Sequence, residues 1–365
     1  MIVELKDVCN KGTSNIRQKD IVSKPGDYPI YGASGLAGNV NFYQQEKASV
    51  AVVKDGAGIG RALLLPAKAS IISTMQYLIP KDNVLPEYLY YAVRNMHLEK
   101  YYSGATIPHI YFKDYKKEKF NLVSLNQQRK IITLFNEIEN TINKRKKKLS
   151  KLDTLVKARF VEMFGDPGLV HRENKVCNLE NVAEVRSSHR IFTREFTKSG
   201  VPFYRGTEIS LLANGKEPIH SYYISKARYD EITKNDSKPK IGDLLMPSIC
   251  DKGQIWLVNT SKPFYYKDGR VLCISPNREK FNTIFFHQYM KMKSQIEYLK
   301  IGSGSTFAEF KIFQLKKLKI NIPPLKLQNE FASFVQQVDK SKVAIQKSLD
   351  ETQTLFDSLM QKYFS

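Results

Sequence analysis

Residues 126–164 read NQQRKIITLFNEIENTINKRKKKLSKLDTLVKARFVEMF and contain neither proline nor glycine. Apolar side chains recur there at a seven-residue step, at Phe135, Ile142, Leu149, Val156 and Met163. A second apolar row passes through Ile131, Ile138 and Leu152, with Arg145 and Arg159 as polar interruptions. Apolar a and d positions over four heptads predict one helix of about 58 Å with a single apolar stripe.

The same block returns 200 residues further along the chain. Gln128 aligns with Gln328 and Phe164 with Phe364, without a gap between them. Just upstream, Ser103-Gly104-Ala105-Thr106 is echoed by Ser303-Gly304-Ser305-Thr306. The apolar rows of the second copy, which Lys342 and Thr352 interrupt, are Val335, Leu349, Phe356 and Tyr363, and Phe331, Val338, Ile345 and Leu359.

Such long helices with one apolar stripe need a partner. We expect the two copies to pair antiparallel, and the alternative is that each packs only on its own globular block. Short apolar strands at 48–53, 62–65, 242–246 and 255–258, with helices at 86–101 and 282–298, predict α+β blocks. The expected order is a globular domain (1–124), a long helix (125–165), a second globular domain (166–324) and a second long helix (325–365), forming a pseudo-twofold internal repeat.

The charge of the chain indicates a polyanionic partner. Lys and Arg number 57 against 36 Asp and Glu, a net charge of +21. The four segments carry +5, +6, +10 and 0 in chain order, so the excess is not confined to a tail. No apolar run is long enough to span a membrane and no signal peptide precedes the first domain, so we expect a cytoplasmic protein. Four cysteines without a CxxC pair are typical of reduced, mostly buried thiols.

Motifs for chemistry are not evident. Residues 56–60 read GAGIG, but no Lys-Ser or Lys-Thr follows and a strand comes next, so a glycine-rich hairpin turn is expected instead of a nucleotide loop. The six histidines show no HxH or HExxH spacing, and no nucleophile elbow occurs. We therefore assign no catalytic residue and no metal ligand, and expect no cofactor in this chain.

Polar and aromatic residues in or beside predicted turns are candidates for DNA contact, because basic groups hold phosphates and polar groups read base edges. For each of them plain surface exposure is the alternative. In the first domain they are Tyr31, Lys54, Arg61 and His109, and in the second they are Arg205, Lys252, Gln254 and Arg270. The run 144–148, KRKKK, lies mid-helix and is expected to be mainly a solvated face.

The order of domain, helix, domain, helix resembles the specificity subunit of type I restriction-modification systems. The residues that carry the resemblance are 242–246 (GDLLM) with the turn after them, 103–106 and 304–306, and the helix entries 125–128 and 325–328. In the first half AVVKDG at 51–56 replaces the Gly-Asp start, so the first domain follows the pattern less well.

The resemblance implies two target-recognition domains, each reading one half of a bipartite double-stranded DNA target. It also implies that the helices set the spacer and dock two modification subunits, and that restriction subunits can join the complex. Adenine-N6 methylation with S-adenosylmethionine, and cleavage with ATP and Mg²⁺, would then belong to the partners. The alternatives are a stand-alone DNA-modifying enzyme or nuclease with an unrecognised active site, and an adaptor that binds only protein.

Overall fold

A computed structural model describes residues 1–21, 25–104, 108–170, 175–218, 222–234, 238–301 and 308–365. The chain forms two compact units. The first contains residues 1–148 and 345–365, and the second contains residues 149–344. Each unit therefore combines one globular block with about half of each long helix. The units differ from the four segments expected from chain order, because each long helix is divided between the two units.

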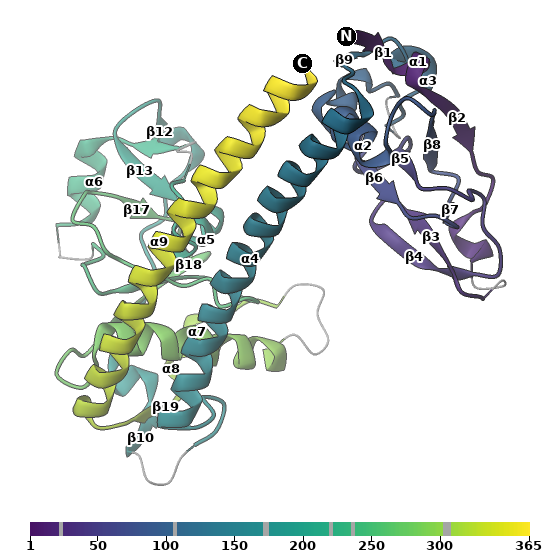
Figure 1. Cartoon of the computed structure of the whole chain (residues 1–365). Coiled ribbons are helices and arrows are strands. Elements are labelled where there is room, and N and C mark those ends of the chain that lie inside the picture. The colour runs from purple at the N-terminus through teal and green to yellow at the C-terminus, as the bar shows by residue number, and fades with distance from the viewer. Residues whose placement is uncertain (22–24, 105–107, 171–174, 219–221, 235–237, 302–307) are drawn as a thin grey trace. The chain divides into compact units, whose positions relative to one another are not determined.

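The two long helices are α4 (Leu125–Phe164) and α9 (Leu325–Phe364), labelled in Figure 1. In the first unit their halves lie antiparallel. The ring of Phe135 is 5.2 Å from that of Phe356, whereas Arg145, further along α4, donates to the carbonyl of Ser348 at 2.8 Å and to the hydroxyl of Thr352. Arg145 and Thr352 both interrupt the apolar rows, and their contact fixes the alignment of the two helices.

The second unit repeats this arrangement with the other two helix halves. The ring of Phe160 on α4 lies 5.5 Å from that of Phe331 on α9. Lys342, the other polar interruption in α9, forms an ion pair of 2.6 Å with Asp153. The predicted antiparallel pairing is thus confirmed separately in each unit. Residues 151–164 and 351–364 even show the same sequence of buried and exposed positions.

The helices also pack on the globular blocks, because their buried stripe is wider than the two heptad rows. Phe160 stacks on Phe285 and Tyr289 of α7 (Thr283–Ile301), at ring distances of 5.7 Å. In the first unit Phe364 lies 4.8 Å from Tyr88 of α2 (Pro86–Asn95). Pairing with the other helix and packing on a block, which the sequence presented as alternatives, therefore both occur.

The first block contains a short pair and two small sheets. Strand β1 (Ile2–Glu4) pairs antiparallel with β9 (Lys119–Asn121). A four-stranded sheet has the order β2-β8-β5-β6, with β2 at Cys9–Thr13, β8 at Met75–Pro80, β5 at Ser49–Val53 and β6 at Ala62–Leu65. The third sheet has the order β4-β3-β7, with β4 at Gly35–Val40, β3 at Tyr28–Gly32 and β7 at Ser70–Ile71. Short helices α1 (Leu5–Val8) and α3 (Phe112–Tyr115) complete the block.

The second block repeats these sheets with one additional strand, β12. Its pair is β10 (Lys175–Asn178) with β19 (Lys319–Ile322), and its four-stranded sheet is β11-β18-β15-β16, at Ala183–Arg186, Val271–Pro276, Leu244–Pro247 and Trp256–Leu257. The remaining sheet is β12-β14-β13-β17, at Phe196–Thr197, Tyr223–Ile224, Val201–Tyr204 and Tyr265–Tyr266. In both blocks the last strand pairs parallel, β7 with β3 and β17 with β13. Short helices are α5 (Gly206–Ala213), α6 (Lys226–Ile232) and α8 (Ile312–Lys316).

A buried glutamine ties each long helix to its block. Gln128 accepts from the N–H of Leu85 at 2.8 Å and donates to the carbonyls of Asn83 and Val123 at 3.0 and 2.9 Å. Its counterpart Gln328 repeats these three bonds with residues 282, 280 and 323, at 2.9, 3.0 and 2.8 Å. Both side chains are fully buried. Gln–Gln identity at the two helix entries thus has a structural cause, because the carboxamide of this side chain supplies the one acceptor and the two donors needed there.

Several predicted elements differ in detail. The helix predicted at 86–101 ends at Asn95, because His97 adopts a left-handed conformation (φ 50°), and a 3₁₀ segment Leu98–Tyr101 follows. The helix predicted at 282–298 extends to Ile301. The GAGIG turn joins antiparallel strands β5 and β6, so the predicted hairpin is confirmed. The echoed motifs at 103–106 and 303–306 lie partly or wholly outside the described residues.

Candidate nucleic-acid interface

Two candidates of the first block, Lys54 and His109, meet at one carboxylate. Nδ1 of His109 lies 2.7 Å from Oδ1 of Asp55, and the ammonium of Lys54 pairs with the same carboxylate. The backbone joins the same segments, because the N–H of Gly56 donates to the carbonyl of Pro108 at 2.9 Å. Residues more than fifty positions apart therefore share one surface beside the GAGIG turn.

The other two candidates have structural contacts of their own. Arg61 is exposed but donates to the carbonyl of Ala33 at 3.2 Å, which holds the GAGIG turn against the turn after β3. Tyr31 is half-buried and packs on the core of the block. Its ring is therefore less accessible to DNA than the sequence suggested.

The sequence reasoning missed Tyr111. Its side chain is 50% exposed, and its ring lies nearly parallel to that of His109, at 6.2 Å. The ammonium of Lys113 is 5.4 Å from the centre of the Tyr111 ring. An exposed aromatic ring between a histidine and a lysine can stack on a base or pack on a sugar. The alternation of His109, Tyr111 and Lys113 was the signal available in the sequence.

Three candidates of the second block line one cavity of about 560 Å³. They are Arg205, Gln254 and Arg270, and Lys267, Thr207 and Ser210 also line it. Lys252 is exposed and lies outside this lining. Guanidinium, amide and hydroxyl groups around one opening are the groups that contact base edges and phosphates.

The charged groups of this cavity are held by partners. Arg205 makes two side-chain bonds to Glu208, at 3.2 and 2.9 Å, and its guanidinium lies 4.7 Å from the centre of the Tyr222 ring. Burial opposes ionisation of Glu208, but hydrogen bonds from Arg205 lower the pKa of its carboxyl below the usual value. Arg270 pairs with Glu309. These carboxylates orient the guanidinium groups and neutralise part of their charge.

Gln254 is also engaged in its own turn. Its amide nitrogen donates to Oδ1 of Asp251 at 2.8 Å, and its Oε1 accepts from the N–H of Lys252 at 3.0 Å. One amide hydrogen and one lone pair remain for a base edge. The structure thus brings Arg205, Gln254 and Arg270 together, while their side chains also have local structural roles.

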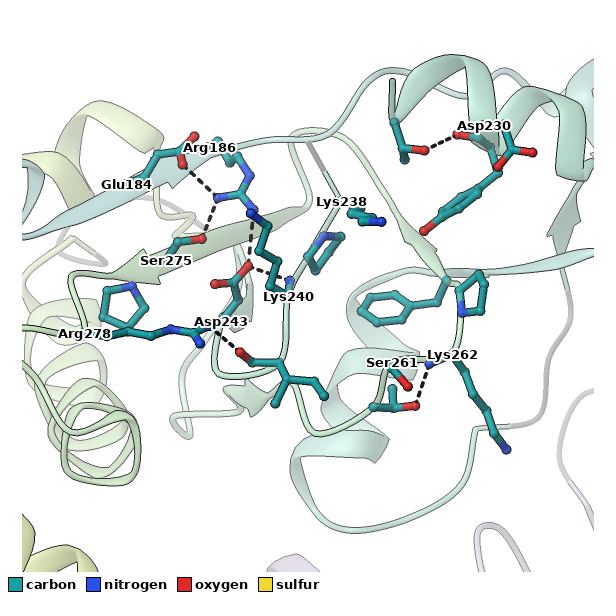
Figure 2. A pocket seen from close by; sticks show the side chains of 18 of the residues that line it. Glu184, Arg186, Asp230, Lys238, Lys240, Asp243, Ser261, Lys262, Ser275 and Arg278 are labelled. Atoms are coloured by element: carbon teal, nitrogen blue, oxygen red, sulfur yellow. Dashed lines mark hydrogen bonds and ion pairs between the residues drawn. The ribbon is translucent and has the colours of Figure 1, made fainter. Parts of the chain in front are cut away.

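A larger cavity of about 1070 Å³, which we call the basic groove, lies elsewhere in the second block (Figure 2). Its walls come from α6, the loop 238–243, the loop 260–264 and strands β11 and β18. Its charged lining residues are six basic and three acidic: Arg186, Lys226, Lys238, Lys240, Lys262 and Arg278, and Glu184, Asp230 and Asp243. The sequence reasoning named none of them as a DNA contact, because they are spread over five separate segments of the chain.

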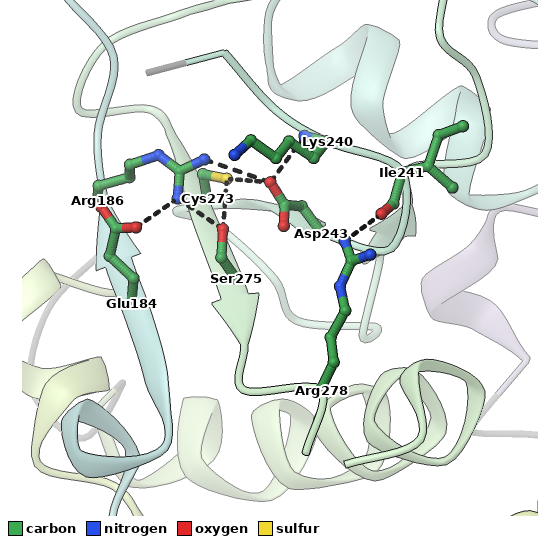
Figure 3. A network of polar contacts seen from close by, with 8 residues as sticks. All are labelled: Glu184, Arg186, Lys240, Ile241, Asp243, Cys273, Ser275 and Arg278. Atoms are coloured by element: carbon green, nitrogen blue, oxygen red, sulfur yellow. Dashed lines mark hydrogen bonds and ion pairs between the residues drawn. The ribbon is translucent and has the colours of Figure 1, made fainter. Parts of the chain in front are cut away.

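Arg186 organises one wall of the basic groove (Figure 3). Its guanidinium donates to the Ser275 hydroxyl at 2.6 Å and lies 3.3 Å from the carboxylates of Glu184 and Asp243. Asp243 is buried, and it accepts from the thiol of Cys273 at 3.8 Å. Burial raises the pKa of the Cys273 thiol to about 12, so it remains a neutral donor. The network neutralises a buried carboxylate at the edge of the sheet.

Among the described residues, no three His, Cys, Asp or Glu side chains gather as they would around a metal ion. None of the helices described is both long enough and apolar enough to cross a membrane.

The fold and these surfaces define a class: a basic protein with two similar α+β blocks on paired long helices, and polar cavities suited to nucleic acid. Residues 1–153 and 171–352 match the family model of the type I restriction modification DNA specificity domain. The chain belongs to this family. Specificity subunits supply DNA recognition and are non-catalytic, and the resemblance stated from the sequence is confirmed.

Individual relatives agree with this assignment. A Haemophilus influenzae protein described as a type I restriction enzyme specificity subunit is 23% identical, over 95% of this chain and 88% of its own length. The MjaVIII specificity subunit of Methanocaldococcus jannaschii is 23% identical, over 78% of this chain and 71% of that protein. The crystal structure of the type I S subunit from M. genitalium has the same fold, with a TM-score of 0.60, 14% identity and coverage of 100% of this chain and 96% of that chain.

Proposed function

We propose that this specificity subunit binds double-stranded DNA with a bipartite target, each globular block reading one half and the long helices setting the unread spacer. The observation that carries the proposal is that one chain holds two copies of the same fold. Their strand orders match apart from the additional strand β12, but the side chains at their polar surfaces differ. Two equivalent frames with unlike surfaces suit two unlike half-sites.

The partners follow from the same repeat. We propose that two copies of a modification subunit dock on the long helices, and that restriction subunits can join them. The pattern of burial along 151–164 equals that along 351–364, and Leu155 and Leu355 are 47% and 51% exposed at equivalent positions. Two identical partners would meet two similar surfaces. Adenine-N6 methylation with S-adenosylmethionine, and cleavage with ATP and Mg²⁺, would then take place on these partners.

The test is selection of duplexes from a random pool by the chain in complex with its modification subunits. We expect two conserved blocks of bases separated by a constant, unread spacer. His109→Ala should relax base preference in one block only, and Gln254→Ala in the other only, since each side chain belongs to one globular block. Gln336→Ala, an exposed change on α9, is the control and should alter neither.

Two outcomes would overturn this proposal. One is a single continuous target, or substitutions that each change both blocks of bases. The other is transfer of a methyl group from S-adenosylmethionine, or cleavage of DNA, by this chain without partners, which would favour the stand-alone enzyme.

A further inference from the structure

The basic groove of the second block contains more positive charge than its own carboxylates neutralise. Its three acidic side chains are already engaged: Glu184 and Asp243 with Arg186, and Asp230 with Lys226. Lys238 and Lys262 are exposed, and neither forms an ion pair with a described residue. An excess of cations around an open cavity attracts a ligand that carries several negative charges.

The loop 238–243, which carries Lys238 and Lys240, is held in place at its C-terminal half. Oδ2 of Asp243 accepts from the N–H of Lys240 at 2.8 Å, and the guanidinium of Arg278 donates to the carbonyl of Ile241 (Figure 3). The N–H of Gly242, whose φ is +93°, donates to the carbonyl of Val258 at 2.8 Å. The backbone between residues 240 and 243 is therefore closed by an internal bond and anchored to two other segments, so little order has to be gained there when a ligand binds.

The first block lacks the network around Arg186 and Arg278 at equivalent positions. The equivalent positions are found from the pairing of the strands. Cys9 pairs with Pro80 in the first block, and Ala183 pairs with Pro276 in the second. Likewise Val50 pairs with Leu78, and Leu244 pairs with Ile274. By that count the first block has uncharged residues at three positions of the network and an acidic residue where Arg278 stands. Arg186, Asp243, Ser275 and Arg278 correspond to Gly12, Ser49, Ile79 and Asp82.

We propose that the basic groove holds the phosphodiester backbone of the half-site read by the second block, and that the first block has no counterpart of this contact. The inference rests on the proposed function and adds to it that, in the second block, the residues that bind phosphates are separate from those that read bases. Lysines on flexible stems from separate segments, around an opening of about 1070 Å³, fit a row of phosphates better than one small anion. The binding free energy of the second half-site should therefore depend more strongly on salt.

The test is a salt titration of DNA binding by the full-length chain in its complex, followed by the anisotropy of a labelled duplex. We compare wild type with the double variant Lys238→Gln, Lys262→Gln. Removing one lysine that neutralises a phosphate should reduce the slope of log K against log salt by about 0.9, so the slope should fall by about 1.8 in the double variant. The affinity should fall by the same factor for duplexes of different sequence, because phosphates carry no base identity.

The matched control is Lys317→Gln, Lys319→Gln. It removes the same charge from the same unit, at exposed residues beside and on β19 that do not line the groove. We expect its slope to equal that of wild type. Both double variants should keep the wild-type melting temperature, since all four side chains are exposed.

The outcomes separate the two proposals. No DNA binding by wild type would overturn the proposed function and this inference with it. Normal binding by wild type, with an unchanged slope in the groove variant or an equal fall in the control, would overturn the inference alone. The inference would also be overturned if inorganic phosphate stabilised wild type against heat but not the groove variant, while the slope of log K against log salt for DNA stayed unchanged in that variant. The groove would then be a site for a small anion.

Discussion

The two globular blocks share their framework but differ in their polar surfaces. The glutamine contacts at the helix entries are the same in both, and the sheet orders match apart from the additional strand β12 of the second block. The charges differ: residues 1–124 have 16 basic and 11 acidic side chains, a net of +5, and residues 166–324 have 26 and 16, a net of +10. Positions that face the helices are constrained by packing on a repeated partner, whereas positions that face solvent are free to diverge.

The difference between the blocks is most visible at the sheet edge. The buried network of Arg186 and Asp243 stands where the first block has Gly12 and Ser49. A methyl group added at Gly12 would lie 3.0 Å from Cβ of Tyr77, so the tyrosine occupies the space that a side chain there would need. The same backbone thus accommodates either a charged network or a tyrosine, which shows how the frame tolerates new surfaces.

The largest expected effect comes from the aromatic residue at the centre of each unit. Phe135→Ala and Phe331→Ala remove fully buried rings, so each should lower the free energy of unfolding of its own unit by about 3–5 kcal/mol. Trp256, the single tryptophan, reports on the second unit in urea titrations, and hydrogen exchange localises the change in the first.

Phe313→Ala is the control for these two changes, because that ring is 60% exposed and should affect stability little. A shift of the Trp256 transition by Phe135→Ala as large as that by Phe331→Ala would mean that the units do not unfold independently.

The glutamine substitutions test whether the repeat extends to energetics. Gln128→Leu and Gln328→Leu should each lower stability by about 2–3 kcal/mol, because each leaves two buried carbonyls and one N–H without a partner. Similar values in the two units, from hydrogen exchange, would confirm equivalent roles. Gln336→Leu, at an exposed position of α9, should change little, and a marked inequality between the two buried sites would contradict the equivalence.

The smallest effect concerns pH and belongs to the second unit alone. Burial lowers the pKa of His287 to about 4, and its Nε2 lies 2.8 Å from the carbonyl of Ile255. As the pH falls below about 6.5, His287 therefore binds a proton in the unfolded state but stays neutral in the folded state. The neutral His287 therefore contributes fully to the free energy of unfolding above that pH, and this free energy falls by about 2 kcal/mol between pH 7 and pH 5.

His287→Gln should flatten this pH dependence in urea titrations that follow Trp256. Hydrogen exchange in the first unit serves as the internal reference, because Tyr90, and not a histidine, stands at the position of α2 that is equivalent to His287. An unchanged slope in the variant would place the proton uptake at another group.

The long helices and their pairing could be predicted because a heptad pattern is local in sequence and has one common packing solution. Even the polar interruptions were visible, although only the structure matched Arg145 with Thr352 and Lys342 with Asp153. The break of the helix at His97 could not be predicted, because no proline or glycine marks it. Base-contacting residues remain predictions. That Lys54 and His109 meet at Asp55 could not be predicted either, because the pairing of strands across the block brings them together.

Periodicity, duplication and net charge are properties of the chain order, and they were sufficient for the architecture, the family and the kind of partner. The basic groove was not accessible in that way. Its charges come from five separate segments between residues 184 and 278, and each is unremarkable in its own segment. Folding brings them within one electrostatic field, and because that field depends on distances in space, it has no counterpart in the linear sequence.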